Sequence, residues 1–339
     1  MGYNKFLDER NKVLSKSNWE IIDQWPLYVG KYNLARTINN IESEKKLLHT
    51  KGVHLVFDKS NLPLSQAIYF DTSDKRMVFA IPRGEKVYVG TTDTIYSKNL
   101  ENPDITIKDK SYIIDAINSL FPDIKLQLKH VESGWSGVRP LIHQAGKGPS
   151  EVSRKDEIFE DSSGLISIAG GKLTGYRKMA EKIVDLVCQR LEVKHSCSTD
   201  HILVSGAVKG GLDGFQQFIE AKTPKLISLG LQKDTSIKLI RRYGHNINEV
   251  ISLFEEKEFH ESKLPLEIYL SLKYSLLNEM TLTLNDFFIR RTNALYFNIQ
   301  LIKNSKYEVA NYMQSYFNWT DSDKNLGLAN LEESIKEAE

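Results

Sequence analysis

The sequence predicts an α+β protein in which an antiparallel or mixed β-sheet precedes an all-α C-terminal region. From Thr50 onward, short runs rich in β-branched and aromatic residues recur about every ten residues, which is typical of an antiparallel meander. Turn-forming stretches such as Asp-Lys-Ser-Asn and Pro-Arg-Gly-Glu separate these runs. After Lys194 the runs stop, and apolar residues recur at the three- and four-residue steps of amphipathic helices.

This change of pattern divides the chain into three segments. Residues 1–48 are a polar and aromatic lead-in with helical character, including a weak helix over Leu34–Leu48, and we expect no chemistry there. Residues 49–194 contain the predicted strands, and residues 195–339 contain the predicted helices. The chain is long enough for these to be separate domains.

The middle segment is predicted to begin with strands and one amphipathic helix. Thr106 is the predicted N-cap of that helix, with Asp109 in the capping-box position. The predicted elements are, in order, strands Gly52–Phe57, Ala67–Asp71, Arg76–Ile81 and Lys86–Thr91, helix Lys108–Leu120, and strands Val131–Arg139, Val152–Phe159 and Leu165–Ala169. The predicted C-terminal helices are Phe215–Ala221, Thr235–Tyr243, Ile247–Glu258, Glu267–Asn278, Leu284–Thr292, Ile299–Phe317 and Asn330–Ala338.

The composition is that of an ordinary globular protein, with 41% hydrophobic and 26% charged residues. A net charge of +1 argues against a protein that binds nucleic acid over a broad surface. No apolar run approaches the roughly 20 residues of a membrane-spanning helix, and the N-terminus lacks the apolar core of a signal peptide. Cys188 and Cys197 are predicted to be free thiols, and the histidines show no zinc-binding spacing. We therefore expect a cytoplasmic, reducing location and no metal.

The stretch 164–177 predicts a strand, a glycine turn and a helix. Leu165–Ala169 has the length and composition of a buried strand, Gly170 and Gly171 interrupt it, and a helical pattern begins at Leu173. A helix N-terminus offers free N–H groups and partial positive charge to a phosphate or an electron-rich ring. Lys172 and Thr174 lie at that terminus. The stretch is not a nucleotide P-loop, because the positions that require a glycine and a hydroxyl residue hold Ile166 and Leu173.

His54, Arg139 and Arg154 are the other candidate site residues. His54 is predicted to lie on the strand face opposite Val53 and Leu55, where it could act as a base or could be an ordinary structural histidine. A buried arginine needs an anionic partner, which is either a ligand phosphate or a protein carboxylate. The small hydroxylated stretch 90–94, which follows a strand, could line a ligand or simply end the strand.

Several blocks of this sequence, in order from about Thr50 to the C-terminus, resemble the bacterial FAD-dependent glycerol-3-phosphate dehydrogenases. The blocks are Thr-Lys-Gly-Val-His (50–54), Gln-Ala-Ile-Tyr-Phe-Asp (66–71), Tyr-Val-Gly-Thr-Thr-Asp (88–93), Ser-Gly-Val-Arg-Pro-Leu (136–141), Ser-Arg-Lys-Asp (153–156), Ala-Gly-Gly-Lys-Leu-Thr-Gly-Tyr-Arg (169–177), Lys-Leu-Pro-Leu-Glu-Ile-Tyr (263–269) and Asp-Phe-Phe-Ile-Arg-Arg (286–291). They correspond to the C-terminal two-thirds of the family. The resemblance implies oxidation of sn-glycerol 3-phosphate to dihydroxyacetone phosphate, with hydride passing to FAD and electrons passing to a membrane quinone.

The resemblance also implies a role for each candidate residue. Arg139, Arg154 and Lys172 would hold the substrate, and His54 and Lys172 would lie at the reacting carbon. The backbone of Gly170, Gly171, Leu173 and Thr174 would contact the flavin. The protein would bind the inner face of the cell membrane peripherally.

One family motif is missing from this sequence. The strand–G-x-G-x-x-G–helix unit that binds the FAD pyrophosphate does not occur in it, and residues 1–48 resemble no segment of the family. Residues 49–194 would therefore be the substrate sheet with a remnant of the FAD-binding α/β domain, and we expect the chain alone to bind FAD weakly or not at all. Two alternatives stay open: a glycerophosphate oxidase that uses oxygen, and a flavin-free module that binds a phosphorylated triol.

Overall fold

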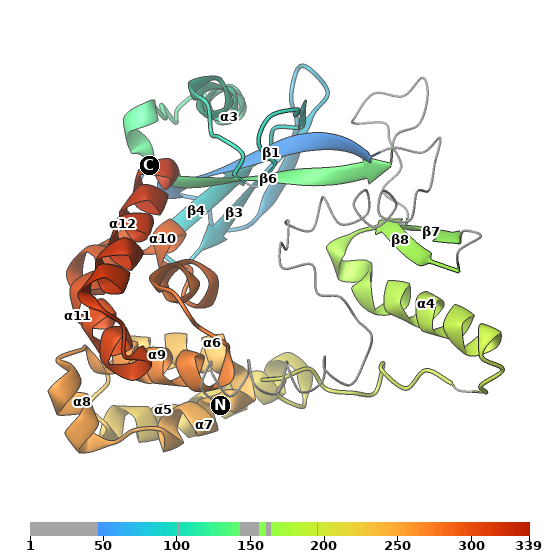
Figure 1. Cartoon of the computed structure of the whole chain (residues 1–339). Helices are drawn as coiled ribbons and strands as arrows, with labels where there is room; N and C mark the ends of the chain where they lie inside the picture. Colours follow the sequence, from blue (N-terminus) through green and yellow to red (C-terminus); the bar gives the residue numbers. More distant parts are fainter. Residues whose placement is uncertain (1–46, 101, 143–155, 161–163, 195) are drawn as a thin grey trace. The chain divides into compact units, whose positions relative to one another are not determined.

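The computed structural model of the protein describes residues 47–100, 102–142, 156–160, 164–194 and 196–339. These residues form two compact units (Figure 1). One contains the β-strands up to residue 200 together with the last three residues, and the other contains the helices of residues 201–336. The predicted lead-in lies outside the described residues, except for Leu47 and Leu48. These two residues begin a strand, so the helix predicted over Leu34–Leu48 is wrong at its C-terminal end.

The larger sheet is antiparallel throughout and is organised around one long strand. β1 (Leu47–Asp58) pairs with β4 (Lys86–Gly90), with β5 (Thr94–Ile95) and with β6 (Val131–Ile142). The sheet continues outward from β4 through β3 (Met77–Arg83) to β2 (Ile68–Asp71). The predicted antiparallel sheet is therefore confirmed, and β2, β3 and β4 form a meander, but β1 lies beside β4 and not beside β2. β1 begins earlier than the predicted strand because its first residues pair with the end of β6.

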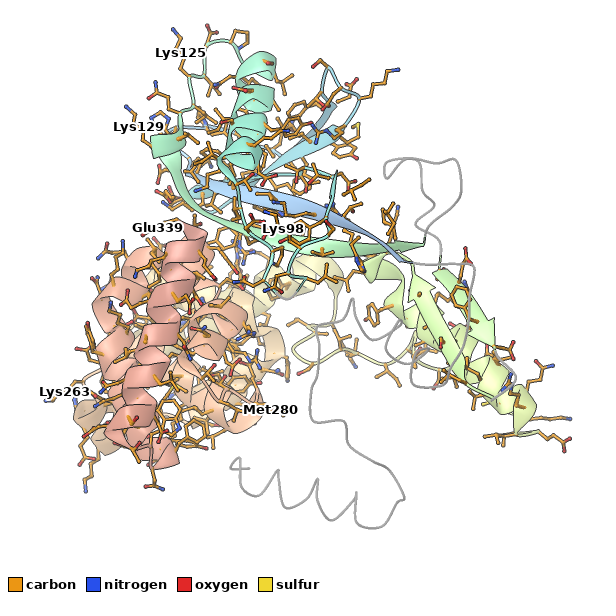
Figure 2. The ribbon with its side chains drawn as sticks, turned by 45° about the horizontal axis from the view of Figure 1, so that its top comes forward. Lys98, Lys125, Lys129, Lys263, Met280 and Glu339 are labelled. Atoms are coloured by element: carbon orange, nitrogen blue, oxygen red, sulfur yellow. The ribbon has the colours of Figure 1, made fainter. Side chains whose placement is uncertain are left out.

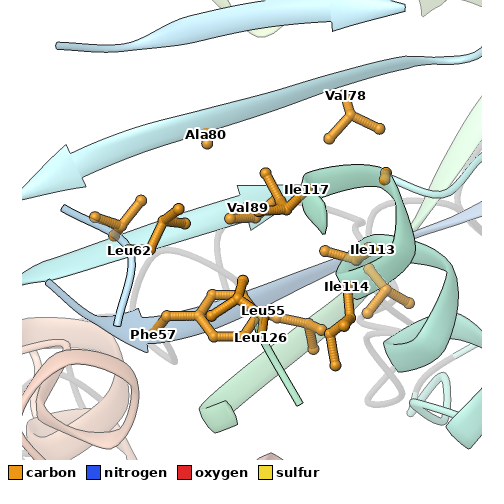
Figure 3. Packing of buried hydrophobic residues seen from close by; sticks show 13 residues of the cluster. Leu55, Phe57, Leu62, Val78, Ala80, Val89, Ile113, Ile114, Ile117 and Leu126 are labelled. Atoms are coloured by element: carbon orange, nitrogen blue, oxygen red, sulfur yellow. The ribbon is translucent and has the colours of Figure 1, made fainter. Parts of the chain in front are cut away.

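One face of this sheet is covered by α3 (Ile107–Leu120), as Figure 3 shows. Val53, Leu55 and Phe57 of β1 are fully buried against residues of the helix such as Ile113 and Ile117. Alternate residues of a strand point to opposite faces, so the residues between them face away from this core. The predicted capping box is confirmed, since the Thr106 side chain accepts from the Asp109 N–H and the Asp109 carboxylate accepts from the Thr106 N–H.

A second, smaller β-sheet carries the glycine turn. β7 (Asp156–Glu160) and β8 (Ile166–Gly170) form an antiparallel pair, and α4 (Tyr176–Arg190) follows. One prediction is wrong here: every residue of β8 is only half-buried, because β7 is the only strand hydrogen-bonded to it among the described residues. The helix predicted from Leu173 begins there as a 3-10 turn over residues 173–175, which continues into α4 at Tyr176.

The helical unit is built around α9 (Leu266–Asn278), in which ten of thirteen residues are buried. Its other helices are α5 (Gly211–Ser228), α6 (Lys233–Tyr243), α7 (Ile247–Ser252), α8 (Glu256–Ser262), α10 (Ala294–Phe297), α11 (Ile299–Phe317) and α12 (Asp321–Ala338), and Asp286–Arg291 is a π-helical turn. The single helix predicted over Ile247–Glu258 is in fact two helices. Lys263, at the end of α8, and Met280, after α9, have positive φ and are labelled in Figure 2.

Candidate functional site

The candidate site lies on the face of the larger sheet opposite α3. Thr50, Gly52 and His54 alternate with the core residues of β1 and therefore belong to this face. Residues directly opposite one another on paired strands share a face. In the β1–β6 register, Thr50 pairs with Arg139, Gly52 pairs with Gly137, and His54 pairs with Trp135. The predicted orientation of His54 is thus confirmed.

His54 is held in place by aromatic rings and by the absence of a neighbouring side chain. Its imidazole stacks on Trp135, with ring centroids 4.9 Å apart and planes 9° apart, and lies 5.5 Å from the Phe79 ring. A Cβ at Gly90 would overlap the imidazole, so only glycine leaves room for it. The buried Nδ1 has no hydrogen-bond partner among the described residues.

The surroundings of His54 keep its imidazole neutral. Burial lowers the pKa of His54 to about 4, and the nearby positive charge of Arg139 acts in the same direction. A neutral imidazole at pH 7 can accept a proton, which an imidazolium cannot. The imidazole is therefore unprotonated at pH 7 and able to accept a proton, while its lowered pKa makes it a weaker base than a free imidazole.

Arg139 has a protein carboxylate as its partner, one of the two alternatives that the sequence left open. Its Nη1 donates to Asp93 Oδ1 at 3.0 Å, and its Nη2 donates to Thr91 Oγ1 at 3.2 Å. The guanidinium lies over Gly52, where an added Cβ would come within 2.6 Å of Nη2. The Arg139 side chain remains 29% exposed, so part of this cation still faces outward.

Asp93 is a site residue that the sequence reasoning missed. The sequence allows the stretch 90–94 to be either a strand end or a ligand-lining segment, and the structure assigns Thr91 and Asp93 to the support of Arg139. The available signal was a carboxylate beside two hydroxyl residues at the end of a strand. The partner could not be identified from it, because Arg139 lies 46 residues further along the chain.

The glycine turn forms a second group of candidate residues. Gly170 and Gly171 both have φ of +79°, a conformation that other residues adopt only with strain. The N–H groups of Gly175 and Tyr176 donate to Lys172 and Leu173 within the 3-10 turn. For the N–H groups of Leu173 and Thr174 the described residues provide no acceptor, and the Leu173 side chain is 90% exposed. Among the described residues, the N–H groups of the turn that have no acceptor are therefore those at 173 and 174, next to the exposed Lys172.

The structure brings some of the predicted residues together and not others. His54 and Arg139 are neighbours on one sheet face, close enough for the cation to lower the histidine pKa. The Cα atoms of β8 come within 8 Å of β6, but Lys172 and Arg139 share no carboxylate partner among the described residues. Arg154 lies outside the described residues.

Neither a metal centre nor a membrane span is found in the described part of the chain. It contains no group of three or more His, Cys, Asp or Glu residues placed to hold an ion. None of its helices combines the length and the apolar character needed to cross a bilayer.

Two protein families match this chain. Residues 30–177 match the family described as FAD dependent oxidoreductase, and residues 197–324 match the C-terminal domain of alpha-glycerophosphate oxidase. The first match begins inside residues 1–48, the segment for which sequence analysis found no resemblance. The second lies within the helical segment of the chain.

Individual relatives agree with these matches. The aerobic glycerol-3-phosphate dehydrogenase of Bacillus subtilis strain 168 is 46% identical over 310 residues, covering 89% of this chain and 56% of the relative. That of Staphylococcus aureus strain USA300 is 45% identical over 342 residues, covering 99% of this chain and 60% of the relative. The solved structure of glycerol-3-phosphate dehydrogenase from Bacillus halodurans, complexed with FAD, is 43% identical with a TM-score of 0.83 over 90% of this chain and 60% of the other. This chain spans about 60% of the length of these relatives, and over that length it is similar to FAD-dependent glycerol-3-phosphate dehydrogenases.

Proposed function

We propose that this chain takes part in the oxidation of sn-glycerol 3-phosphate to dihydroxyacetone phosphate, with FAD as cofactor. The observation that supports this most directly is the pair formed by His54 and Arg139 on the open face of the sheet. A neutral base lies beside a guanidinium held by Asp93, so a proton acceptor and an anion binder are positioned together. Two relatives of this chain are named as aerobic glycerol-3-phosphate dehydrogenases.

The substrate would be held by its phosphate and deprotonated at its hydroxyl group. The outward part of the Arg139 guanidinium donates to phosphate oxygens, because its planar fork matches an oxyanion. Arg154 and Lys172 add positive charge to the same anion. His54 accepts the proton of the hydroxyl group on the carbon that is oxidised, because its imidazole is unprotonated near pH 7.

The glycine turn fits the pyrimidine edge of a flavin. That edge is electron-rich and becomes more negative on reduction, and the free N–H groups of Leu173 and Thr174 beside Lys172 are suited to such charge. The positive φ of Gly170 and Gly171 allows the backbone to approach a ring closely. When bound, the flavin supplies a two-electron acceptor for the hydride that leaves the substrate carbon.

The electron acceptor after the flavin is proposed to be a membrane quinone, reached by peripheral binding at the cytoplasmic face of the cell membrane. The second candidate is molecular oxygen, which is favoured by the match of residues 197–324 to the C-terminal domain of alpha-glycerophosphate oxidase. Hydrogen peroxide released in an aerobic assay supports oxygen. Reduction of a short-chain quinone without peroxide supports the dehydrogenase.

The proposal is tested with the purified chain, added FAD and glycerol 3-phosphate under anaerobic conditions. Because the sequence predicts weak FAD binding by the chain alone, FAD is kept in excess, and its absorption bands should bleach on addition of the substrate. The His54→Gln variant should bleach at least about 100-fold more slowly, because a general base typically contributes this much to a rate. Lys108→Met, an exposed position on α3, is the control and should behave as the parent chain does. A chain that retains flavin and never bleaches would disprove the activity.

If no flavin is retained, calorimetry with glycerol 3-phosphate in the absence of FAD examines the flavin-free binding module. Binding that disappears in Arg139→Ala would support the module. Binding that is unchanged in this variant would rule out Arg139 as the phosphate ligand.

A further inference from the structure

Gly137 occupies the middle of the candidate site. It pairs with Gly52 in the β1–β6 register and shares the sheet face of Arg139 and Trp135, which lie two residues to either side of it. Same-face neighbours on a strand are about 7 Å apart, so Gly137 marks a gap between the guanidinium side chain and the stacked Trp135–His54 rings. Gly137 itself is exposed, whereas Gly52 opposite it is buried beneath the Arg139 guanidinium.

The structure provides no conformational or packing reason for glycine at position 137. Its φ lies outside the left-handed region, and a Cβ built on it meets no atom of the described residues within 4 Å. The other glycines near the site differ, because a Cβ at Gly52 would crowd Arg139 and a Cβ at Gly90 would overlap His54. Glycine in a strand interior weakens the strand. The bare position at 137 therefore lowers stability and benefits no contact of the described residues.

We propose that Gly137 is the floor on which the carbon skeleton of glycerol 3-phosphate lies, and that its missing side chain determines the size of ligand admitted. This inference rests on the proposed function and deepens it. The phosphate would lie toward Arg139 and the oxidised carbon toward His54, with the three-carbon chain crossing the gap between them. A side chain at 137 would fill that gap while leaving Arg139, Asp93 and His54 in place.

The expected effects distinguish the carbon skeleton from the phosphate. Gly137→Ala should weaken binding of glycerol 3-phosphate by at least about 10-fold and Gly137→Val by more, since one extra carbon in a fitted site changes affinity by about 10- to 200-fold. Binding of inorganic phosphate should change less than about 2-fold, because Arg139 remains free to bind it. The free energy of unfolding should stay the same or rise, because the added methyl group meets no other atom.

The experiment is isothermal titration calorimetry of the full 339-residue chain with glycerol 3-phosphate and with inorganic phosphate, each with and without FAD, together with urea denaturation. Gly327→Ala on α12 is the matched control, because its Cβ would make ordinary contact at 3.7 Å and it belongs to the helical unit. Its affinities for both ligands should equal those of the parent chain. Arg139→Ala should lose both ligands.

Every other outcome contradicts either the inference about Gly137 or the proposed function. If Gly137→Ala binds glycerol 3-phosphate as the parent does, the inference is wrong and the proposed function stands. Equal weakening of both ligands also contradicts it, because position 137 would then act through Arg139. An unfolded Gly137→Ala would show that the position is needed for packing, which contradicts the premise. A parent chain that binds neither ligand removes the proposed function together with the inference.

Discussion

Protonation of the His54 imidazole destabilises the folded state, because the ring is packed against aromatic side chains and lies near the Arg139 guanidinium. The same two features that prepare this histidine to act as a base at pH 7 therefore make it a source of acid sensitivity. Arg139 in turn depends on Asp93, Thr91 and the bare backbone of Gly52 for its position. The pKa of His54 thus depends on Arg139, and the position of Arg139 depends on its hydrogen bonds to Asp93 and Thr91.

The pH dependence of stability follows from His54. Its pKa is about 4 in the folded chain and returns to its ordinary value of 6.5 on unfolding, so the unfolded chain binds more protons between these values. The stabilisation from the neutral imidazole is complete above pH 6.5 and is lost as the pH falls to 4, amounting to up to about 3 kcal/mol. Urea denaturation between pH 6.5 and pH 4 should show this loss of stability. The loss should be smaller in the His54→Gln variant. An unchanged profile in the variant would contradict the prediction.

Gly52→Ala is expected to move Arg139 and to lower stability, because Asp93 and Thr91 would lose their hydrogen bonds from the guanidinium. The new Cβ would come within 2.6 Å of Nη2, 2.7 Å of Nη1 and 2.7 Å of Thr91 Oγ1. With the guanidinium displaced, the pKa of His54 should rise, and NMR titration of the imidazole measures it. Gly137→Ala on the opposite strand is the control and should leave this pKa unchanged. A constant pKa in Gly52→Ala would mean that the guanidinium had not moved.

At the scale of elements, β1 and α3 are joined by a buried ion pair as well as by apolar packing. Lys51 Nζ donates to Asp109 Oδ2 at 2.8 Å, and both side chains are buried. Burial raises the pKa of Asp109, but hydrogen bonds from Lys51 and Thr106 outweigh this and leave the pKa below its usual value. One carboxylate thus caps the helix and fixes the helix to the strand.

Lys51→Met should destabilise the sheet unit by about 3 kcal/mol, because it leaves the Asp109 carboxylate buried without its cation. Chemical denaturation measures this change in the free energy of unfolding. Lys108→Met, one residue from Asp109 and exposed to solvent, should change stability by less than about 0.5 kcal/mol. Equal effects of the two substitutions would show that the ion pair does not stabilise the fold.

At the scale of the whole molecule, the helical unit has a core of its own. Tyr269 and Leu270 of α9 and Phe287 and Phe288 of the π-helical turn are almost completely buried, and all lie within residues 201–336. A domain with its own core can fold alone. The second family match, over residues 197–324, begins close to the start of this unit. The domain boundary predicted at residues 194 and 195 stays a prediction.

A fragment of residues 201–339 should therefore be helical and should unfold cooperatively. Far-UV circular dichroism with urea gives both the helix content and the shape of the transition. Tyr269→Ala in the fragment should lower its stability by about 3 kcal/mol or more, as expected for a large buried aromatic residue. A gradual unfolding transition without a folded baseline would show that these helices need the rest of the chain in order to fold.

The sequence by itself determined the elements, because helix and strand patterns depend on residues close together in the chain. The two-residue alternation placed His54 opposite Val53 and Leu55, and the Thr106–Asp109 spacing predicted the cap. Local patterns were insufficient where tertiary contacts decide burial, as in β8, which has the pattern of a buried strand but is half-buried. They also missed the break between α7 and α8.

Only the tertiary structure decided how the site is assembled. Asp93 and Arg139 come together because β4 and β6 pair with opposite edges of β1, and no local pattern encodes that register. The same register distinguishes Gly52, which makes room for a guanidinium, from Gly137, whose added Cβ would meet no atom of the described residues within 4 Å. The residue type is glycine in both places. The role of the glycine at each position depends on which side chains the neighbouring strands place beside it.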